Sequence, residues 1–171
     1  MKDDFDASLL RKRKGKKINS RAKGNRFENK VAKMLNKRFK TDEFCRTPGS
    51  GAFATTHKLP KYLQLHGDLI TPEKFRFVIE CKKGYNNEGL SELLNPKSNT
   101  SKMIAQASRD SKKANKKFLL IVGQDRKDPI VITNDPVSIP RVAVFEGNSR
   151  STKIFILKLD ELLTSSTSYF F

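Results

Sequence analysis

The apolar residues of this chain occur in short runs, and the longest uninterrupted run spans residues 118–122. Five residues suit a buried strand, whereas a helix that crosses a bilayer needs about 20. We therefore expect no membrane span. Hydrophobic residues still make up 36% of the 171 residues, which is enough for the core of one domain and argues against a globally disordered chain.

The periodicity of the apolar residues predicts an α/β fold. Phe27, Val31 and Leu35 recur at helical spacing after two residues of N-cap type, Asn19 and Ser20, so we expect a helix over 21–40. The further predicted elements are a strand over 42–47, a hairpin of strands 65–71 and 75–82, a helical turn around 91–94, a helix over 101–115, strands over 118–122, 130–133, 142–145 and 154–157, and a helical turn over 160–163. This order predicts a central mixed β-sheet flanked by helices.

Positive charge is concentrated at the start of the chain. The formal net charge is +17, and residues 1–40 hold 15 Lys and Arg against four acidic residues. Such a surplus indicates a polyanionic partner. The first residues have too few apolar side chains to pack, so we expect a flexible basic arm over 1–18, a domain over 19–163 and a C-terminal tail over 164–171. The arm residues that we expect to contact DNA phosphates are Arg11, Lys12, Arg13, Lys14, Lys16 and Lys17. The alternative functions of the arm are a targeting signal and a solubilising tail.

Cysteine content and the N-terminal residues indicate an intracellular protein. Cys45 and Cys81 are too few for a disulfide framework, which favours a reducing compartment. The first ten residues include Asp3, Asp4 and Asp6 and lack the apolar segment of a secretory signal. We expect the cytoplasm of a prokaryotic or virus-infected cell, and a nuclear location stays open.

Acidic residues and a lysine recur where two predicted strands meet. Asp68 follows Gly67 in the first strand, and Glu80, Cys81 and Lys82 lie near the end of the second. Because side chains alternate along a strand, Glu80 and Lys82 project from one face and Cys81 from the other. Two converging carboxylates suit Mg²⁺, and a lysine beside them can stabilise negative charge on a phosphate. The alternative is a structural Glu–Lys pair on an exposed face and an aspartate in a turn.

The pattern Gly67-Asp68, followed on a strand by Glu80-Cys81-Lys82, resembles the PD-(D/E)xK nuclease superfamily, whose fold is restriction-endonuclease-like. Within it, two segments resemble the archaeal type of Holliday-junction resolvase. Residues 24–28 are similar to an N-terminal helix whose glutamate is a further active-site acid, and residues 44–52 to the strand and Ser-Gly loop before the catalytic strands. The likeness covers about residues 24–122. Gly67 stands where the superfamily has Pro, and the loop over 51–66 is long.

The resemblance implies a role for each matching residue. It makes Glu28, Asp68 and Glu80 acids of a site for Mg²⁺, for which Mn²⁺ can substitute, and Lys82 the catalytic lysine. The backbone carbonyl of Cys81 is implied as a further metal ligand. The DNA contacts that we expect in addition to the arm are Arg46, Ser50, Lys83 and Gln106.

These features predict a metal-dependent, structure-selective DNA endonuclease, and first of all a Holliday-junction resolvase that acts as a homodimer in DNA recombination or repair. A two-fold dimer presents two identical sites to two equivalent strands of a four-way junction. The alternative within the superfamily is a restriction- or repair-type nuclease of linear or single-stranded DNA. The alternative of another class is a non-catalytic basic nucleic-acid-binding protein. The apolar end of Tyr169, Phe170 and Phe171 either makes a weak contact with a partner such as a sliding clamp, or packs or frays.

Overall fold

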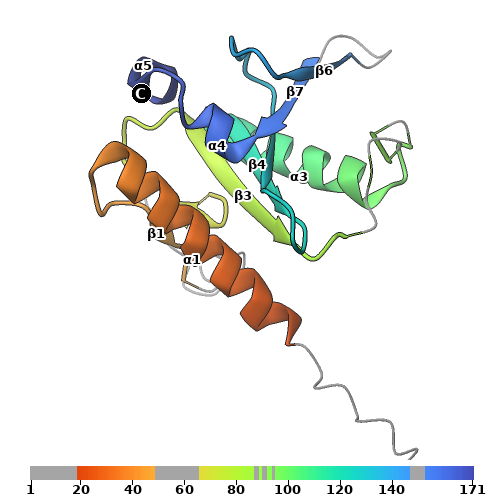
Figure 1. Cartoon of the computed structure of the whole chain (residues 1–171), viewed down its shortest axis with the longest axis horizontal. Helices are drawn as coiled ribbons and strands as arrows, with labels where there is room; N and C mark the ends of the chain where they lie inside the picture. Colours follow the sequence, from red (N-terminus) through yellow and green to blue (C-terminus); the bar gives the residue numbers. More distant parts are fainter. Residues whose placement is uncertain (1–18, 49–65, 87–88, 90–91, 94, 147–152) are drawn as a thin grey trace, which may run out of the picture.

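The computed structural model describes residues 19–48, 66–86, 89, 92–93, 95–146 and 153–171. Its main layer is a five-stranded mixed sheet with the strand order β3-β4-β5-β7-β6, and Figure 1 shows α1 and α3 on either side of it. The predicted α/β fold is confirmed. The six basic arm residues and Ser50, predicted to contact DNA, lie outside the described residues. None of the helices in the described part of the chain is both long and apolar enough to cross a membrane.

The described elements follow the predicted order. The strands are β1 (Cys45–Arg46), β2 (Leu69–Ile70), β3 (Phe77–Lys83), β4 (Lys117–Gly123), β5 (Ile130–Thr133), β6 (Ala143–Glu146) and β7 (Lys153–Lys158). The helices are α1 (Ser20–Phe39), α3 (Asn99–Lys113), α4 (Leu159–Leu162) and α5 (Thr167–Phe170). Strands β3 and β4 run parallel, and the other neighbours in the large sheet run antiparallel.

Helix α1 forms where its cap and its apolar stripe predict it. The Asn19 side chain accepts a hydrogen bond from the N–H of Ala22 at 3.1 Å, which satisfies one of the free donors at the helix start. The helix ends at Lys40, whose backbone adopts a left-handed conformation with φ 53°. The residues that the helix buries are Phe27, Glu28, Val31, Ala32 and Leu35. A glutamate therefore lies within the buried stripe.

Two hydrophobic clusters cover the two faces of the sheet. Phe27, Val31 and Leu35 of α1 pack in one cluster with β3 residues that include Ile79 and Cys81. Met103 and Ala107 of α3 pack in the other with Leu120 of β4. Because side chains alternate along β3, the strand contributes to the α1 side through its odd-numbered residues and to the α3 side through its even-numbered ones. Among the described strands, β3 is also an edge of this sheet and pairs only with β4.

The predicted hairpin of strands 65–71 and 75–82 is wrong. Strand β2 pairs antiparallel with β1, with Ile70 opposite Cys45, instead of forming a ladder with β3. It approaches β3 through the Asp68 N–H, which donates to the Ile79 carbonyl at 2.8 Å. Gly67 permits this approach because its φ is 83° and a Cβ there would lie 2.5 Å from the Ile79 carbonyl oxygen. Apolar alternation predicts a strand but not its partner.

The chain end packs on the domain. Residues 164–171 include α5, and Phe170 is fully buried among the rings of Phe39, Phe75 and Phe77. The backbone N–H of Arg76 donates to the Phe170 carbonyl at 2.8 Å. Of the two predicted alternatives for this end, packing holds for Phe170, because a clamp-type contact through that ring would first require it to leave the core.

The buried position of Phe170 predicts a specific loss of stability. Phe170→Ala should lower the free energy of unfolding by about 3–5 kcal/mol, the usual cost of deleting a buried aromatic side chain. Phe171→Ala, the matched control, should cost less than half as much because that side chain is 38% exposed. Urea unfolding of both variants measures the difference, and equal losses would show that Phe170 is not part of the core.

Candidate active site

Glu80 and Lys82 of β3 form a buried ion pair, as the alternation of the strand predicts. The Lys82 Nζ donates to Glu80 Oε2 at 3.1 Å, and Glu80 is only 3% exposed. The same oxygen accepts a long contact of 3.5 Å from Gln106 Nε2 on α3. The alternative of a Glu–Lys pair on an exposed face is therefore wrong: this glutamate lies between the sheet and α3, where a charge is costly unless it is paired.

Asp68 forms two hydrogen bonds with the unpaired edge of β3. Its Oδ2 accepts the backbone N–H of Cys81 at 2.8 Å, and its own N–H donates to the carbonyl of Ile79. The carboxylate thus pairs with one N–H of a strand edge that no other strand of the described structure covers. Since the N–H and C=O of one residue project from the same edge of a strand, the Cys81 carbonyl also faces the Asp68 side. This direction is consistent with the prediction that the Cys81 carbonyl is a metal ligand.

Glu28 reaches the same cluster from α1. It is 7% exposed, and its Oε2 is buried without a hydrogen-bond partner within the described structure. The nearest cation is Arg46 of β1, whose Nη1 lies 3.8 Å from that oxygen. Burial raises the pKa of Glu28, the charge of Asp68 raises it further, and Arg46 and Lys82 oppose the rise. Four segments that are distant in the sequence, at residues 28, 46, 68 and 80–82, therefore act on one another electrostatically.

The carboxylates of this cluster repel one another. Burial raises the pKa of Glu80 to about 7, the charge of Asp68 adds to the rise, and the ammonium of Lys82 opposes it. Burial alone would lower the pKa of Lys82, but the charges of Glu80 and Asp68 outweigh it and raise that pKa overall. Lys82 is therefore a firmly charged ammonium. The cluster favours a further cation because Lys82 and Arg46 together do not balance three carboxylates.

The buried thiol of Cys81 takes no part in this chemistry. Burial raises its pKa well above the ordinary value, and the neighbouring carboxylates raise it further. A neutral thiol is a poor nucleophile and a poor metal ligand. Cys81 instead contacts the cluster through its backbone N–H, which donates to Asp68.

The donor set fits a hard divalent cation with an incomplete protein shell. Among the described residues, no three His, Cys, Asp or Glu side chains are gathered closely enough to hold a metal ion by themselves. Magnesium is commonly held by one or two carboxylates, with water and substrate phosphate filling the remaining positions. The unpartnered buried oxygen of Glu28 and the raised pKa values of Glu28 and Glu80 fit such an ion.

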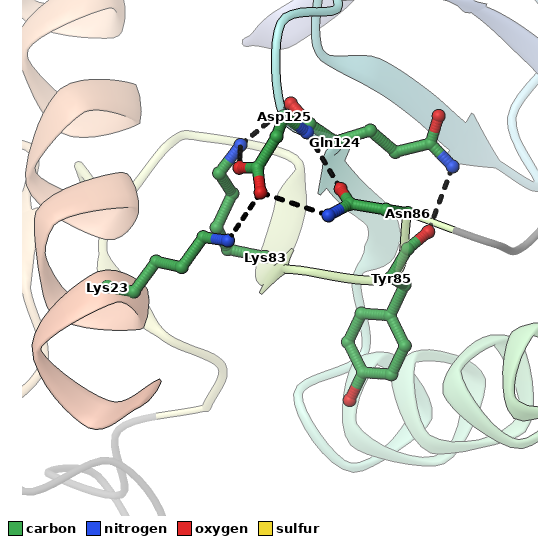
Figure 2. A network of polar contacts seen from close by, with 6 residues as sticks. All are labelled: Lys23, Lys83, Tyr85, Asn86, Gln124 and Asp125. Carbon is green, nitrogen blue, oxygen red and sulfur yellow. Dashed lines mark hydrogen bonds and ion pairs between the residues drawn. The ribbon is translucent and has the colours of Figure 1, made fainter. Parts of the chain in front are cut away.

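The other predicted DNA contacts divide between two places. Arg46 lies beside Glu28, and Gln106 lies beside Glu80. Lys83 instead projects from the opposite face of β3, where its Nζ contacts Asp125 Oδ1 at 3.0 Å. Sequence reasoning missed this partner and the two other side chains that contact Asp125 in Figure 2, Lys23 and Asn86, because no motif or spacing connects them.

One family model matches most of the chain. The family model described as "Phage putative PDDEXK endonuclease" matches residues 19–168, which begin at the cap of α1 and end within α5. The chain belongs to this family. No curated protein and no solved structure matches it significantly.

Membership in the PDDEXK endonuclease family confirms the resemblance to the PD-(D/E)xK superfamily and indicates a nuclease. The mixed sheet with helices on both sides is consistent with the restriction-endonuclease-like fold. The family match does not show a particular relationship to the archaeal Holliday-junction resolvases. In this PDDEXK family member, the pattern Asp68, Glu80, Lys82 coincides with the place where buried carboxylates and an ammonium meet.

The crowded carboxylates predict stabilisation by a divalent cation. Mg²⁺ at ten to a hundred times its dissociation constant should raise the free energy of unfolding by about 1.4–2.7 kcal/mol relative to buffer with EDTA. Glu80→Gln should lose most of this response. Glu146→Gln, which alters an exposed carboxylate on β6, should keep it. Urea unfolding with and without Mg²⁺ measures the response, and an undiminished one in Glu80→Gln would mean that the ion binds elsewhere.

Proposed function

We propose that this protein is a metal-dependent endonuclease that hydrolyses phosphodiester bonds of DNA at the cluster of Glu28, Asp68, Glu80 and Lys82. The observation that carries the proposal is the bond from the Cys81 N–H to the Asp68 carboxylate, which brings that acid beside the Glu80–Lys82 pair. Family membership and the net charge of +17 support a nucleic-acid substrate.

Each residue has a separate task in the proposed reaction. Asp68, Glu80 and the Cys81 carbonyl, with Glu28 from α1, would hold Mg²⁺ or Mn²⁺. A bound divalent ion lowers the pKa of water and offsets negative charge on the oxygens of the phosphate. Lys82 stays protonated, so it places a positive charge next to the phosphate and orients the attacking water. Arg46, adjacent to Glu28, supplies a second cation for the phosphate oxygens.

The finer proposal concerns the DNA structure that is cut. We propose four-way junctions as the preferred substrate and a homodimer as the active form, because Glu28 on α1 and the segment over 44–52 resemble the junction resolvases. A two-fold dimer would offer one site to each of two equivalent strands. DNA recombination or repair in the cytoplasm of a prokaryotic or virus-infected cell would use such an activity. Cleavage of linear or single-stranded DNA is the alternative within the superfamily.

A non-catalytic DNA-binding protein is the alternative of another class. Carboxylates that face a phosphate backbone weaken binding through like-charge repulsion, so a binder gains nothing from three of them. The presence of Glu28, Asp68 and Glu80 together in a strongly basic chain is better explained by a bound cation.

The proposed roles predict separate effects on cleavage and on binding. Glu80→Gln should reduce Mg²⁺-dependent DNA cleavage at least 1,000-fold and leave DNA affinity within about threefold, because it removes a ligand and not a phosphate contact. Lys82→Ala should reduce cleavage by about 100- to 1,000-fold, as is usual for the loss of one group that stabilises the transition state. Gel-based cleavage and fluorescence anisotropy measure the two quantities. Glu146→Gln serves as the control, and full cleavage by Glu80→Gln contradicts the assignment.

The choice of substrate is tested by matched DNA molecules. We compare junction, nicked, flap and linear duplexes built from the same oligonucleotides. The kcat/KM for the junction should be at least tenfold higher than for each of the others. The physical reason is recognition of backbone geometry by a basic surface without base-reading motifs. Equal cutting of the linear duplex would support the restriction- or repair-type alternative, and no cutting of any substrate with Mg²⁺ or Mn²⁺ would favour the non-catalytic binder.

A further inference from the structure

A cationic pocket, separate from the candidate active site, lies on the side of α1 away from Glu28. It is a pocket of about 270 Å³ between the first half of α1 and the carboxyl ends of β3 and β4. Besides Phe27, Gly123, Gln124 and Pro129, its lining consists of cations. We call it the basic pocket, and the five cations that line it are Lys23, Arg26, Lys30, Lys83 and Lys127. Within the described part of the chain, no acidic residue belongs to the lining.

Two of the five cations are held in place by one carboxylate. Lys23 Nζ lies 2.7 Å from Asp125 Oδ2, and Lys83 Nζ lies 3.0 Å from Asp125 Oδ1. Figure 2 shows these side chains converging from α1, from the end of β3 and from the turn after β4. Asn86 holds the carboxylate through a side-chain hydrogen bond of 2.9 Å and accepts the Asp125 N–H at 2.8 Å. Fixed lysines lose less conformational entropy when they bind an anion.

The remaining three cations have no acidic partner in the described structure. Arg26, Lys30 and Lys127 are exposed, and no carboxylate of the described residues lies within 4.0 Å of their charged groups. Five cations around a small volume, with a single carboxylate at its rim, repel one another. An anion in the pocket relieves this repulsion.

The floor of the basic pocket is fixed by close packing. A Cβ on Gly123 would lie 2.5 Å from the ring of Phe27 and 3.1 Å from Cδ of Lys83. The Lys83 Nζ also lies 5.8 Å from the centroid of the Phe27 ring, a cation–π distance. Helix α1 therefore sits directly on the ends of β3 and β4, and this packing fixes the backbone positions from which the cations project.

The pocket and the acids share the same helix and strand. Phe27 of the pocket precedes Glu28 of the acid cluster, and Lys83 of the pocket follows Lys82. The two sites thus lie on opposite flanks of the contact between α1 and β3. A helix with its side chains is about 10–12 Å across, and the major groove of B-DNA is about 12 Å wide. One duplex can therefore present a backbone phosphate to each flank.

We propose that the basic pocket binds a backbone phosphate of the DNA substrate, at a position other than the phosphate that is cut. This inference rests on the proposed function for the identity of the substrate. Phosphate bound there would orient the duplex across α1 and supply affinity without sequence preference. The shared chemistry is a phosphate group, so a free nucleotide or inorganic phosphate is the competing source.

The test compares three variants of the full chain in EDTA, where binding is measured without cleavage. Arg26→Ala/Lys30→Ala/Lys127→Ala removes the three unpaired cations and keeps the anchored pair. Arg26→Lys/Lys30→Arg/Lys127→Arg keeps every charge. Lys74→Ala/Lys112→Ala/Lys153→Ala is the matched control, since it removes the same charge from exposed positions outside the pocket. Thermal unfolding confirms that each variant is folded.

We expect the first variant to bind a 20-base-pair duplex about tenfold more weakly at about 0.1 M salt. The slope of log K against log salt should fall by about 1–2, the value for one or two lost phosphate contacts. The charge-retaining variant should match the original protein in affinity and slope. The control should keep its slope within about 0.5.

Two results would overturn the inference. Equal losses in the pocket variant and the control would show that only total charge matters. Unchanged DNA binding by the pocket variant, together with loss of the binding of inorganic phosphate or a deoxynucleoside monophosphate in NMR titrations, would assign the pocket to a small ligand. Because these measurements need no cleavage, they decide on the pocket even if the protein cuts no DNA and the proposed function fails.

Discussion

The candidate active site depends on one hydrogen bond at an unpaired strand edge. In the described structure β3 pairs with a strand, β4, on one side only, and Asp68 accepts the Cys81 N–H on the other side at 2.8 Å. An open strand edge normally attracts another strand. Here a carboxylate takes that position, and Gly67 allows the chain to come close enough. This hydrogen bond thereby places Asp68 beside Glu80 and Lys82.

Stability and function oppose each other around this bond. Glu28 and Glu80 are buried, both pKa values are raised, and one buried oxygen of Glu28 has no partner in the described structure. A protein selected only for stability would fill such a site with apolar residues. Helix α1 carries this unfavourable charge on one flank and a cluster of cations on the other. The same helix therefore joins the proposed site of hydrolysis to the proposed site of DNA attachment.

Sequence patterns predicted the individual helices and strands and the faces of their side chains. Apolar periodicity predicts α1, β4 and β5 within a few residues, and strand alternation places Glu80 and Lys82 on one face. The hairpin was wrong because alternation cannot tell whether β2 pairs with β3 or with β1. Glu28 stands out only through the family resemblance, because in the sequence it lies one step off the apolar stripe and fits an exposed helix position equally well. The pair of Lys23 and Asp125 joins residues 102 apart in the sequence, and no motif contains both.

The central claim is that acids from α1, from the segment before β2 and from β3 form one metal site. Anomalous diffraction from crystals of the full chain grown with Mn²⁺ and a short duplex tests it most directly. The account predicts a Mn²⁺ peak in contact with Asp68 and Glu80, next to the Cys81 carbonyl and on the side that faces Glu28. A peak only at other residues, or none at millimolar Mn²⁺ with DNA bound, would contradict it.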